Sequence, residues 1–186
     1  MFLKKKGFTL MEMIIAVLIV AILAGAALRV FDRFVERSRA SDADNTIGLA
    51  AYAQGRQLMR RGNYTTRWTA LDAAPLATYM DKTGDYVNEE GTIFFTKGGG
   101  EEHPRGGFKM YFVKKGDGFF IVADRINWHY SYSLVRPLPQ GRTYCVPGSS
   151  WSDKSFCMEY MEVDDESEIP PDPRTLVEGD EEDADY

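Results

Sequence analysis

A long apolar run stands at the start of the chain. Residues 8–28 are 21 positions with a single charged side chain, Glu12. An α-helix rises about 1.5 Å per residue, so this run is about 30 Å long and matches the hydrocarbon core of a bilayer. The pattern therefore predicts a transmembrane helix over residues 8–28, preceded by a basic leader peptide at residues 1–7.

The position of the positive charges predicts the orientation of this helix. Lys4, Lys5 and Lys6 precede the apolar run, and basic residues stay preferentially on the cytoplasmic side. The N-terminus is then cytoplasmic and the remainder of the chain lies outside the membrane. A cleavable secretory signal has the same order of charges, but its apolar region is usually about 7–15 residues long. A buried core helix of a soluble protein is disfavoured because the apolar run is so long.

Helical periodicity continues beyond the apolar run. Residues 29–61 contain no proline and are rich in helix-forming residues. Apolar positions recur at helical spacing, and charged residues occupy the other faces. Arg60, Arg61 and Gly62 are typical of a helix C-terminus, with cations in the last turn and a left-handed glycine cap. We expect an amphipathic continuation over residues 29–61 that supports a soluble domain. A helix on the membrane surface is the alternative, and the mixed charge argues against it.

The pattern changes to short strands in the next part of the chain, residues 62–158. This part begins with turn residues and one short helical candidate at residues 74–80. Strand signals follow at residues 92–96, 108–113, 118–124 and 128–135, and KKGDG supplies a hairpin turn between the second and third. Four consecutive strands suggest an antiparallel meander. The predicted fold class is α+β, in which the long N-terminal helix packs on a small antiparallel β-sheet as an extracytoplasmic domain.

Charge separates the last part of the chain from the rest. The net charge is −6, but residues 159–186 hold 13 acidic residues and one basic residue, Arg174, so the remainder carries about +6. This last segment has few large apolar residues. Such a composition predicts an acidic disordered tail over residues 159–186.

The residues that usually carry catalysis or bind cofactors do not form a recognisable set. The glycine run at residues 98–100 lacks the Lys-Ser/Thr pair of a phosphate loop. His103 and His129 have no cysteine, aspartate or serine at a useful spacing, and two cysteines without nearby histidines lack a metal-ligand set. We therefore expect no catalytic residues, no cofactor and no metal, and a protein that is not an enzyme.

Glu12 is the anomaly of the apolar run. An ionised carboxylate inside a bilayer costs on the order of 2.5–3.5 kcal/mol even on lenient insertion scales, so it needs a partner. The span contains no basic side chain. Cleavage between Gly7 and Phe8 would create a positive α-amine at the membrane boundary, and Glu12 would become the fifth residue of the mature chain.

These residues also carry a family resemblance. The string KKKG followed by FTLMEMIIAVLIVAIL resembles the N-terminus of type IV pilins and type II secretion pseudopilins. The resemblance implies that a prepilin peptidase cuts after Gly7 and methylates Phe8, and that Glu12 is required for assembly. It covers about the first 30 residues. Relatives commonly carry a proline near the end of the apolar run, where this chain has Arg29, so a kink there is not implied.

Two cysteines lie in the later part of the chain, Cys145 and Cys157. In an oxidising extracytoplasmic compartment they can pair. Closing a loop of about 13 residues stabilises a fold by roughly 3 kcal/mol in the chain-entropy account. Pilins often carry a C-terminal disulfide loop, which agrees with this pairing. A weaker likeness to pilin domains is the pattern formed by Gly62, Tyr64, Leu71 and Asp72.

The resemblance gives the functional expectation. It implies a bacterial structural subunit in the inner membrane that polymerises into a pilus or a type II secretion pseudopilus, in the periplasm or at the cell surface. Its partners are then the prepilin peptidase, an inner-membrane assembly machinery, and identical or related pilin subunits. One alternative is a minor pilin or membrane-anchored module that contacts DNA or a surface, although no nucleic-acid motif supports it. The other is a membrane-anchored enzyme or receptor that never polymerises.

Overall fold

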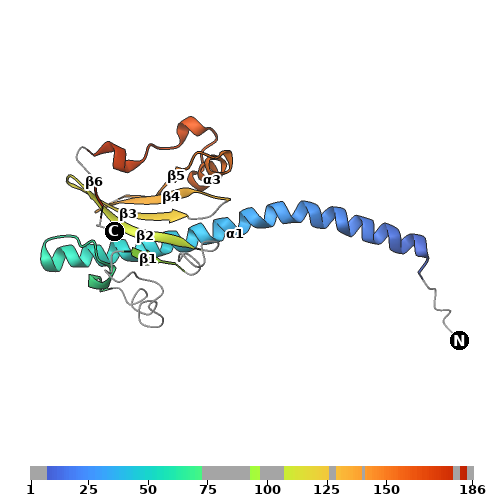
Figure 1. The fold of residues 1–186 in the computed structure, drawn as a ribbon, viewed down its shortest axis with the longest axis horizontal. Helices are drawn as coiled ribbons and strands as arrows, with labels where there is room; N and C mark the ends of the chain where they lie inside the picture. The colour runs from blue at the N-terminus through green and yellow to red at the C-terminus, as the bar shows by residue number, and fades with distance from the viewer. Residues whose placement is uncertain are drawn as a thin grey trace. The chain divides into compact units, whose positions relative to one another are not determined.

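A computed structural model describes residues 8–72, 93–96, 107–125, 129–139, 141–177 and 181–183. The chain divides into two compact units, residues 1–38 (the anchor unit) and residues 39–186 (the globular unit). Helix α1, Leu10–Arg61, contributes its first part to the anchor unit and its second part to the globular unit (Figure 1). The short helical candidate at residues 74–80 lies outside the described residues.

The anchor unit is a helix with an apolar surface. The described side chains of residues 8–34 are all exposed, including Ile22 and Leu23. By length and composition, α1 is the one helix in the described part of the chain that can cross a membrane. The predicted helix over the apolar run is therefore confirmed, with its first helical residue at Leu10.

The second part of α1 ends where the sequence predicts. Gly62 takes a φ of 76°, and its N–H donates to the Leu58 carbonyl at 2.8 Å. Arg60 and Arg61 lie in the last turn, next to the negative end of the helix dipole. The chain then turns back, since the buried Gln54 amide donates to the Thr65 carbonyl at 2.6 Å and accepts from its N–H at 3.1 Å. A short 3-10 helix, η1 (Trp68–Ala70), follows.

The globular unit contains one antiparallel sheet. Strands β1 (Ile93–Phe95), β2 (Phe108–Lys115), β3 (Gly118–Arg125), β4 (Tyr132–Leu138) and β5 (Tyr144–Pro147) pair in this order, and β6 (Glu181–Asp183) also pairs with β2. The α+β fold and its meander are confirmed. The predicted hairpin joins β2 to β3, with Lys115 opposite Gly118 and Gly116 at a φ of 53°. The fourth strand lies later than predicted, and neither β5 nor β6 was predicted.

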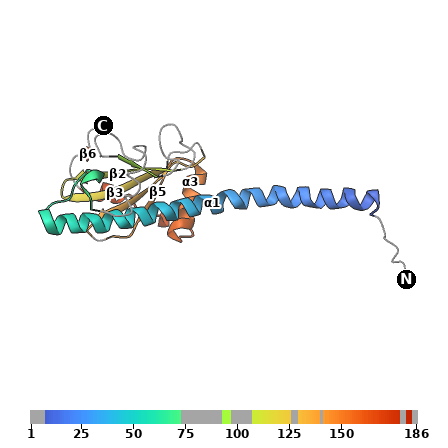
Figure 2. The same cartoon turned by 90° about the horizontal axis from the view of Figure 1, so that it is seen from below.

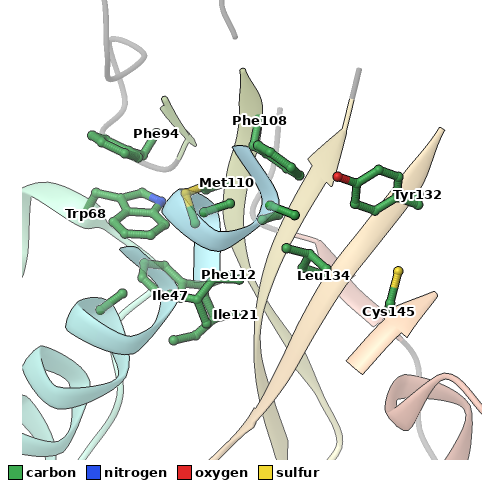
Figure 3. Packing of buried hydrophobic residues seen from close by; sticks show 14 of the residues in the cluster. Ile47, Trp68, Phe94, Phe108, Met110, Phe112, Ile121, Tyr132, Leu134 and Cys145 are labelled. Carbon is green, nitrogen blue, oxygen red and sulfur yellow. The ribbon is translucent and has the colours of Figure 1, made fainter. Parts of the chain in front are cut away.

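Large apolar side chains along the strands point alternately to the two faces of the sheet. On the inner face, the globular part of α1 lies along the strands (Figure 2). It packs against them through alanines and Ile47, the latter labelled in Figure 3. The inner-face cluster includes Ala40, Ala43, Ile47, Ala50, Trp68, Phe94, Phe108, Met110, Phe112, Phe119, Ile121, Tyr132, Leu134, Cys145, Phe156 and Cys157. The Trp68 and Phe112 rings stack with centroids 4.4 Å apart. Alanines on α1 let the helix approach the aromatic sheet closely.

The opposite face of the sheet is also covered. The outer-face cluster consists of buried Val113, Phe120, Val122 and Val135 with Tyr111, Val146 and Val177 packed against them. Val177 follows η3 (Pro173–Leu176), so a segment near the end of the chain contributes to this second core. Both faces of the sheet are therefore shielded from water within the globular unit.

The prediction of a disordered tail at residues 159–186 disagrees with the structure over the described part of this segment, residues 159–177 and 181–183. Helix α3 (Trp151–Met161) runs past position 159, and η2 (Glu166–Glu168), η3 and β6 follow it. Local side-chain bonds explain the order in this acidic segment. Asp172 accepts from Arg174 Nη2 at 2.7 Å, and Asp165 accepts from the Ser167 N–H at 2.8 Å. Acidic composition alone therefore did not predict the local structure of the described part of this segment.

Candidate functional site

The first turn of α1 holds the glutamate that the sequence singles out. The Glu12 N–H donates to Thr9 Oγ1 at 3.3 Å, and the Thr9 N–H donates to Glu12 Oε2 at 3.4 Å. These reciprocal bonds form a capping box, which satisfies backbone donors that the first helical turn leaves unpaired. The Glu12 carboxylate is thereby folded back toward Phe8 and Thr9, at the start of the helix.

Thr9 supplies uncharged hydrogen-bond donors to the Glu12 carboxylate. Thr9 Oγ1 also lies 3.4 Å from Glu12 Oε2 and can donate to it. Both donors are uncharged, so they satisfy hydrogen bonding at the carboxylate but leave its negative charge in place. The role of Thr9 was missed at the sequence level, although the Thr-x-x-Glu spacing in TLME is the ordinary signature of a capping box. Phe8 is exposed beside this turn, and Gly7 lies outside the described residues.

An apolar seam follows directly along the anchor unit. A shallow surface on α1 is lined by Leu10, Met13, Ile14, Val17, Leu18, Ala21 and Ile22. The spacing of three and four residues places these side chains along one stripe of the helix. Such a stripe suits contact with lipid or with another apolar helix.

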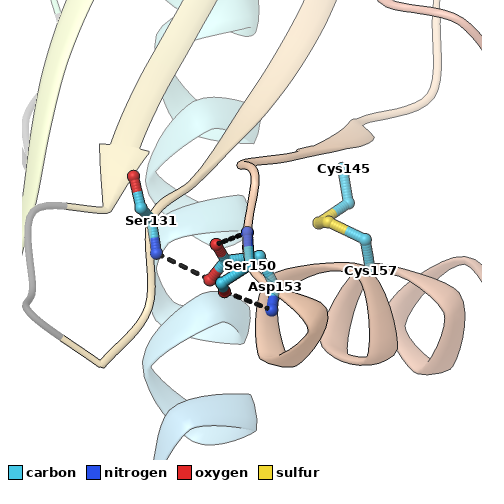
Figure 4. Close-up of a disulfide and its surroundings, with 5 residues drawn as sticks. All are labelled: Ser131, Cys145, Ser150, Asp153 and Cys157. Carbon is cyan, nitrogen blue, oxygen red and sulfur yellow. Dashed lines mark hydrogen bonds between the residues drawn. A yellow bond between two sulfur atoms is a disulfide. The ribbon is translucent and has the colours of Figure 1, made fainter.

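The predicted disulfide is present in the globular unit. Cys145 on β5 and Cys157 on α3 are bonded, their Cα atoms are 5.3 Å apart, and both residues are buried (Figure 4). The bond fastens α3 to the edge of the sheet, and Phe156 stacks on Tyr132 of β4 at 4.5 Å between ring centroids. The second half of the segment between the cysteines, from Trp151 onward, is helical, and the sequence did not predict this helix.

A second capping box starts α3 inside the disulfide loop. Asp153 N–H donates to Ser150 Oγ at 3.2 Å, and the Ser150 N–H donates to Asp153 Oδ2 at 3.4 Å. The buried Asp153 carboxylate also accepts from the Ser131 N–H at 2.8 Å, which ties α3 to the residue before β4 (Figure 4). Gly148 fits this corner because an added Cβ would lie 2.1 Å from the Ser131 carbonyl oxygen. The Ser-x-x-Asp spacing in SWSD could have indicated this helix.

The weaker pilin-like pattern after α1 has a structural role. Asp72 accepts from Arg60 Nη1 at 3.0 Å, and Arg56 donates to the Asp72 carbonyl. Tyr64 lies on Phe119 of β3 with ring centroids 4.9 Å apart, and Leu71 is buried. The Asp72 contacts hold the returning chain against the last turns of α1, and the Tyr64 contact packs it on the sheet.

The residues that the structure describes contain no group of histidine, cysteine, aspartate and glutamate side chains able to hold a metal ion. His129 is exposed at the surface before β4. His103 and the glycine run at residues 98–100 lie outside the described residues.

Comparison with known proteins gives one match. Residues 3–28 match the prokaryotic N-terminal methylation motif, the prepilin-type signal of type IV pilins and pseudopilins. No curated protein and no solved structure matches the chain. The motif supports a type IV pilin-like protein that is processed by prepilin peptidase, and proteins with this motif are structural rather than enzymatic. Together with the apolar helix, it indicates anchoring in a membrane.

Proposed function

We propose that this chain is a pilin-like structural subunit that polymerises into a helical pilus or pseudopilus. The observation that carries the proposal is the methylation motif at residues 3–28, which coincides with an apolar helix whose first turn is capped by Thr9 and Glu12. Before processing, the chain is anchored in the inner membrane with its leader in the cytoplasm and the globular unit outside. An inner-membrane assembly machinery then moves subunits into a filament in the periplasm or at the cell surface.

Processing creates a positive charge that can pair with the Glu12 carboxylate. Cleavage between Gly7 and Phe8 leaves an α-amine on Phe8, and N-methylation retains its positive charge. The amine then lies four residues before Glu12, next to the Thr9 capping box. The mature helix therefore carries one cation and one anion at its apolar end.

These two charges can set the register of neighbouring subunits. Glu12 of an incoming subunit pairs with the Phe8 amine of a neighbour, while the apolar seams of the two helices pack side by side. A misplaced subunit leaves a charge unpaired in a medium of low dielectric constant, which costs several kcal/mol. Head-to-tail contacts of this kind do not close on themselves, so they generate an open helical polymer.

Mass spectrometry of the mature protein tests the processing step. The expected N-terminal residue is methylated Phe8, in a chain that lacks residues 1–7. Recovery of membrane-inserted protein that retains the leader in cells with active prepilin peptidase would contradict the proposal.

Substitution of Glu12 tests the register step. We expect Glu12→Gln and Glu12→Ala chains to be cleaved and inserted normally but to lose filament assembly by at least tenfold. Asp32→Asn is the matched control, because it removes an exposed carboxylate from the same helix and outside the apolar run. Wild-type filament yield from processed Glu12→Ala subunits would show that the pairing does not direct assembly.

A further inference from the structure

One edge of β2 is covered by two separate segments. Strand β3 pairs with β2 along its full length, from Phe108 to Lys115. On the other edge, within the described residues, β1 pairs with residues 109–111 and β6 pairs with residues 113–115. An uncovered strand edge presents free N–H and C=O groups that can pair with another chain. Strand β6 therefore covers the stretch of this edge that lies beyond the β1 pairing in the described part of the chain.

Charge favours the pairing of β6 with this edge. Residues 178–186 carry six acidic side chains and no basic one. In the observed register, Glu182 lies opposite Lys114 and Glu181 lies opposite Lys115. Opposite charges at facing positions of an antiparallel pair stabilise it. The edge is thus matched to an acidic, extended segment by its backbone and by its two lysines.

The residues just before β6 hold it on its own sheet. Val177 packs in the outer-face cluster, and its Cγ2 lies 3.1 Å from the position that a Cβ on Gly118 would take. Upstream, Asp172 and Arg174 form a partly buried ion pair at 2.7 Å. Only three residues separate Val177 from Glu181 in the chain. Because Val177 is fixed on the sheet, the local concentration of β6 at the edge of β2 is high, as for any ligand on a short tether.

We propose that the Val113–Lys115 edge of β2 is a strand-addition site for the acidic C-terminal segment of a second copy of this chain. In each copy, β6 occupies that site in cis and keeps it closed. A second copy fits the site because it carries the same acidic strand that the edge already pairs with. When β6 leaves, the edge accepts the corresponding strand in trans, so that two globular units become linked. This inference does not depend on filament assembly or on processing.

The first test measures binding of the isolated segment. A fluorescent peptide of residues 178–186 is titrated into two chains in nanodiscs, the full chain and a chain that ends at Val177. We expect binding to the truncated chain to be at least tenfold tighter than to the full chain, and to weaken as salt is raised because the charges are screened. Adding Lys114→Glu and Lys115→Glu to the truncated chain should abolish binding.

A control peptide separates strand pairing from simple charge attraction. Backbone N-methylation at positions 181–183 keeps every side-chain charge but removes the three N–H donors, and this peptide should not bind. Equal binding of both peptides would overturn strand addition. Equal binding of the parent peptide to the full and truncated chains, or binding to neither, would overturn the closed-edge proposal. Circular dichroism and an intact disulfide establish that the truncated chain is folded.

The second test uses complementary chains in trans. A full chain with Lys114→Glu and Lys115→Glu repels its own β6 and acts as the donor, while the chain ending at Val177 acts as the acceptor. Each is labelled in a separate nanodisc. We expect energy transfer for the donor–acceptor mixture and only baseline transfer for either chain alone or for two wild-type chains. Baseline transfer in the mixture would show that a second copy does not use this edge.

Discussion

The anchor unit and the globular unit treat apolar side chains in opposite ways. The described side chains of residues 8–34 are all exposed, although most of them are aliphatic or aromatic. In the globular unit, apolar residues form clusters on both faces of the sheet. The globular unit therefore buries its own surface on folding, whereas the anchor unit depends on lipid or on other chains. Substitutions in the two units should consequently appear in different measurements.

The largest effect should come from the centre of the inner-face cluster. Trp68 is fully buried and contacts both Phe112 and Phe94, with ring centroids 4.4 and 5.2 Å away. We expect Trp68→Ala to lower the free energy of unfolding by about 3–5 kcal/mol, because it removes aromatic packing and leaves a cavity. Urea-dependent pulse proteolysis of the full chain in detergent measures this change.

The matched control for Trp68 lies in the anchor unit. Leu18 is apolar but 57% exposed, so Leu18→Ala should leave the unfolding midpoint of the globular unit unchanged. A similar loss from both substitutions would show that apolar side chains of the anchor unit stabilise the globular unit as much as its own core does. A negligible loss from Trp68→Ala would show that the inner-face cluster does not stabilise the fold.

The second effect is smaller and concerns the disulfide. The bond closes a loop with a sequence separation of 12 residues. In the chain-entropy account its removal costs about 3 kcal/mol. We expect the Cys145→Ser, Cys157→Ser double variant to lose about that much stability in urea denaturation, with membrane insertion unchanged. The parent chain treated with a reductant that opens the bond should reach the same stability as the double variant. Loss of insertion in the variant would contradict the independence of the two units.

The elements that could be predicted from sequence are those with a strong local period. The apolar run, the helical spacing through Arg61 and the alternating strands around the KKGDG turn are all found in the structure. Glu12 stood out because a lone charge in an apolar run is costly. These features depend on residues that are close together in the sequence, so they can be predicted from a single sequence.

The elements that were missed depend on small polar signals and distant contacts. Helix α3 begins at a Ser150–Asp153 capping box, which is a signal of only two polar residues. The order after position 159 comes from the Asp172–Arg174 pair and from Val177 on the outer face of the sheet. Pairing of β6 with β2 joins residues almost 70 positions apart in the chain, and no local period reports such a contact. The capping role of Thr9 was not predicted, because it depends on the three-residue spacing to Glu12 and not on the charge of Glu12.

The smallest expected effect is a dependence on alkaline pH that only the globular unit should show. Tyr160 on α3 has a raised pKa because it is partly buried, and the nearby Asp44 carboxylate raises it further while Arg136 lowers it. Asp44 is itself fixed by a hydrogen bond from Thr143. The folded state therefore holds the phenol proton more tightly than the unfolded state does. Residues 8–38 contain no tyrosine.

The sign of this effect follows from proton linkage. Well below pH 10, the ordinary pKa of tyrosine, the Tyr160 phenol is protonated in both states and does not change the unfolding equilibrium with pH. As the pH approaches and then passes that value, the unfolded state loses its proton first, so the free energy of unfolding falls as the pH rises. We expect Tyr160→Phe to flatten this fall in urea denaturation between about pH 9 and 11, a range centred on the ordinary tyrosine pKa. An unchanged slope in the variant would mean that ionisation of Tyr160 is not what weakens the globular unit in alkali.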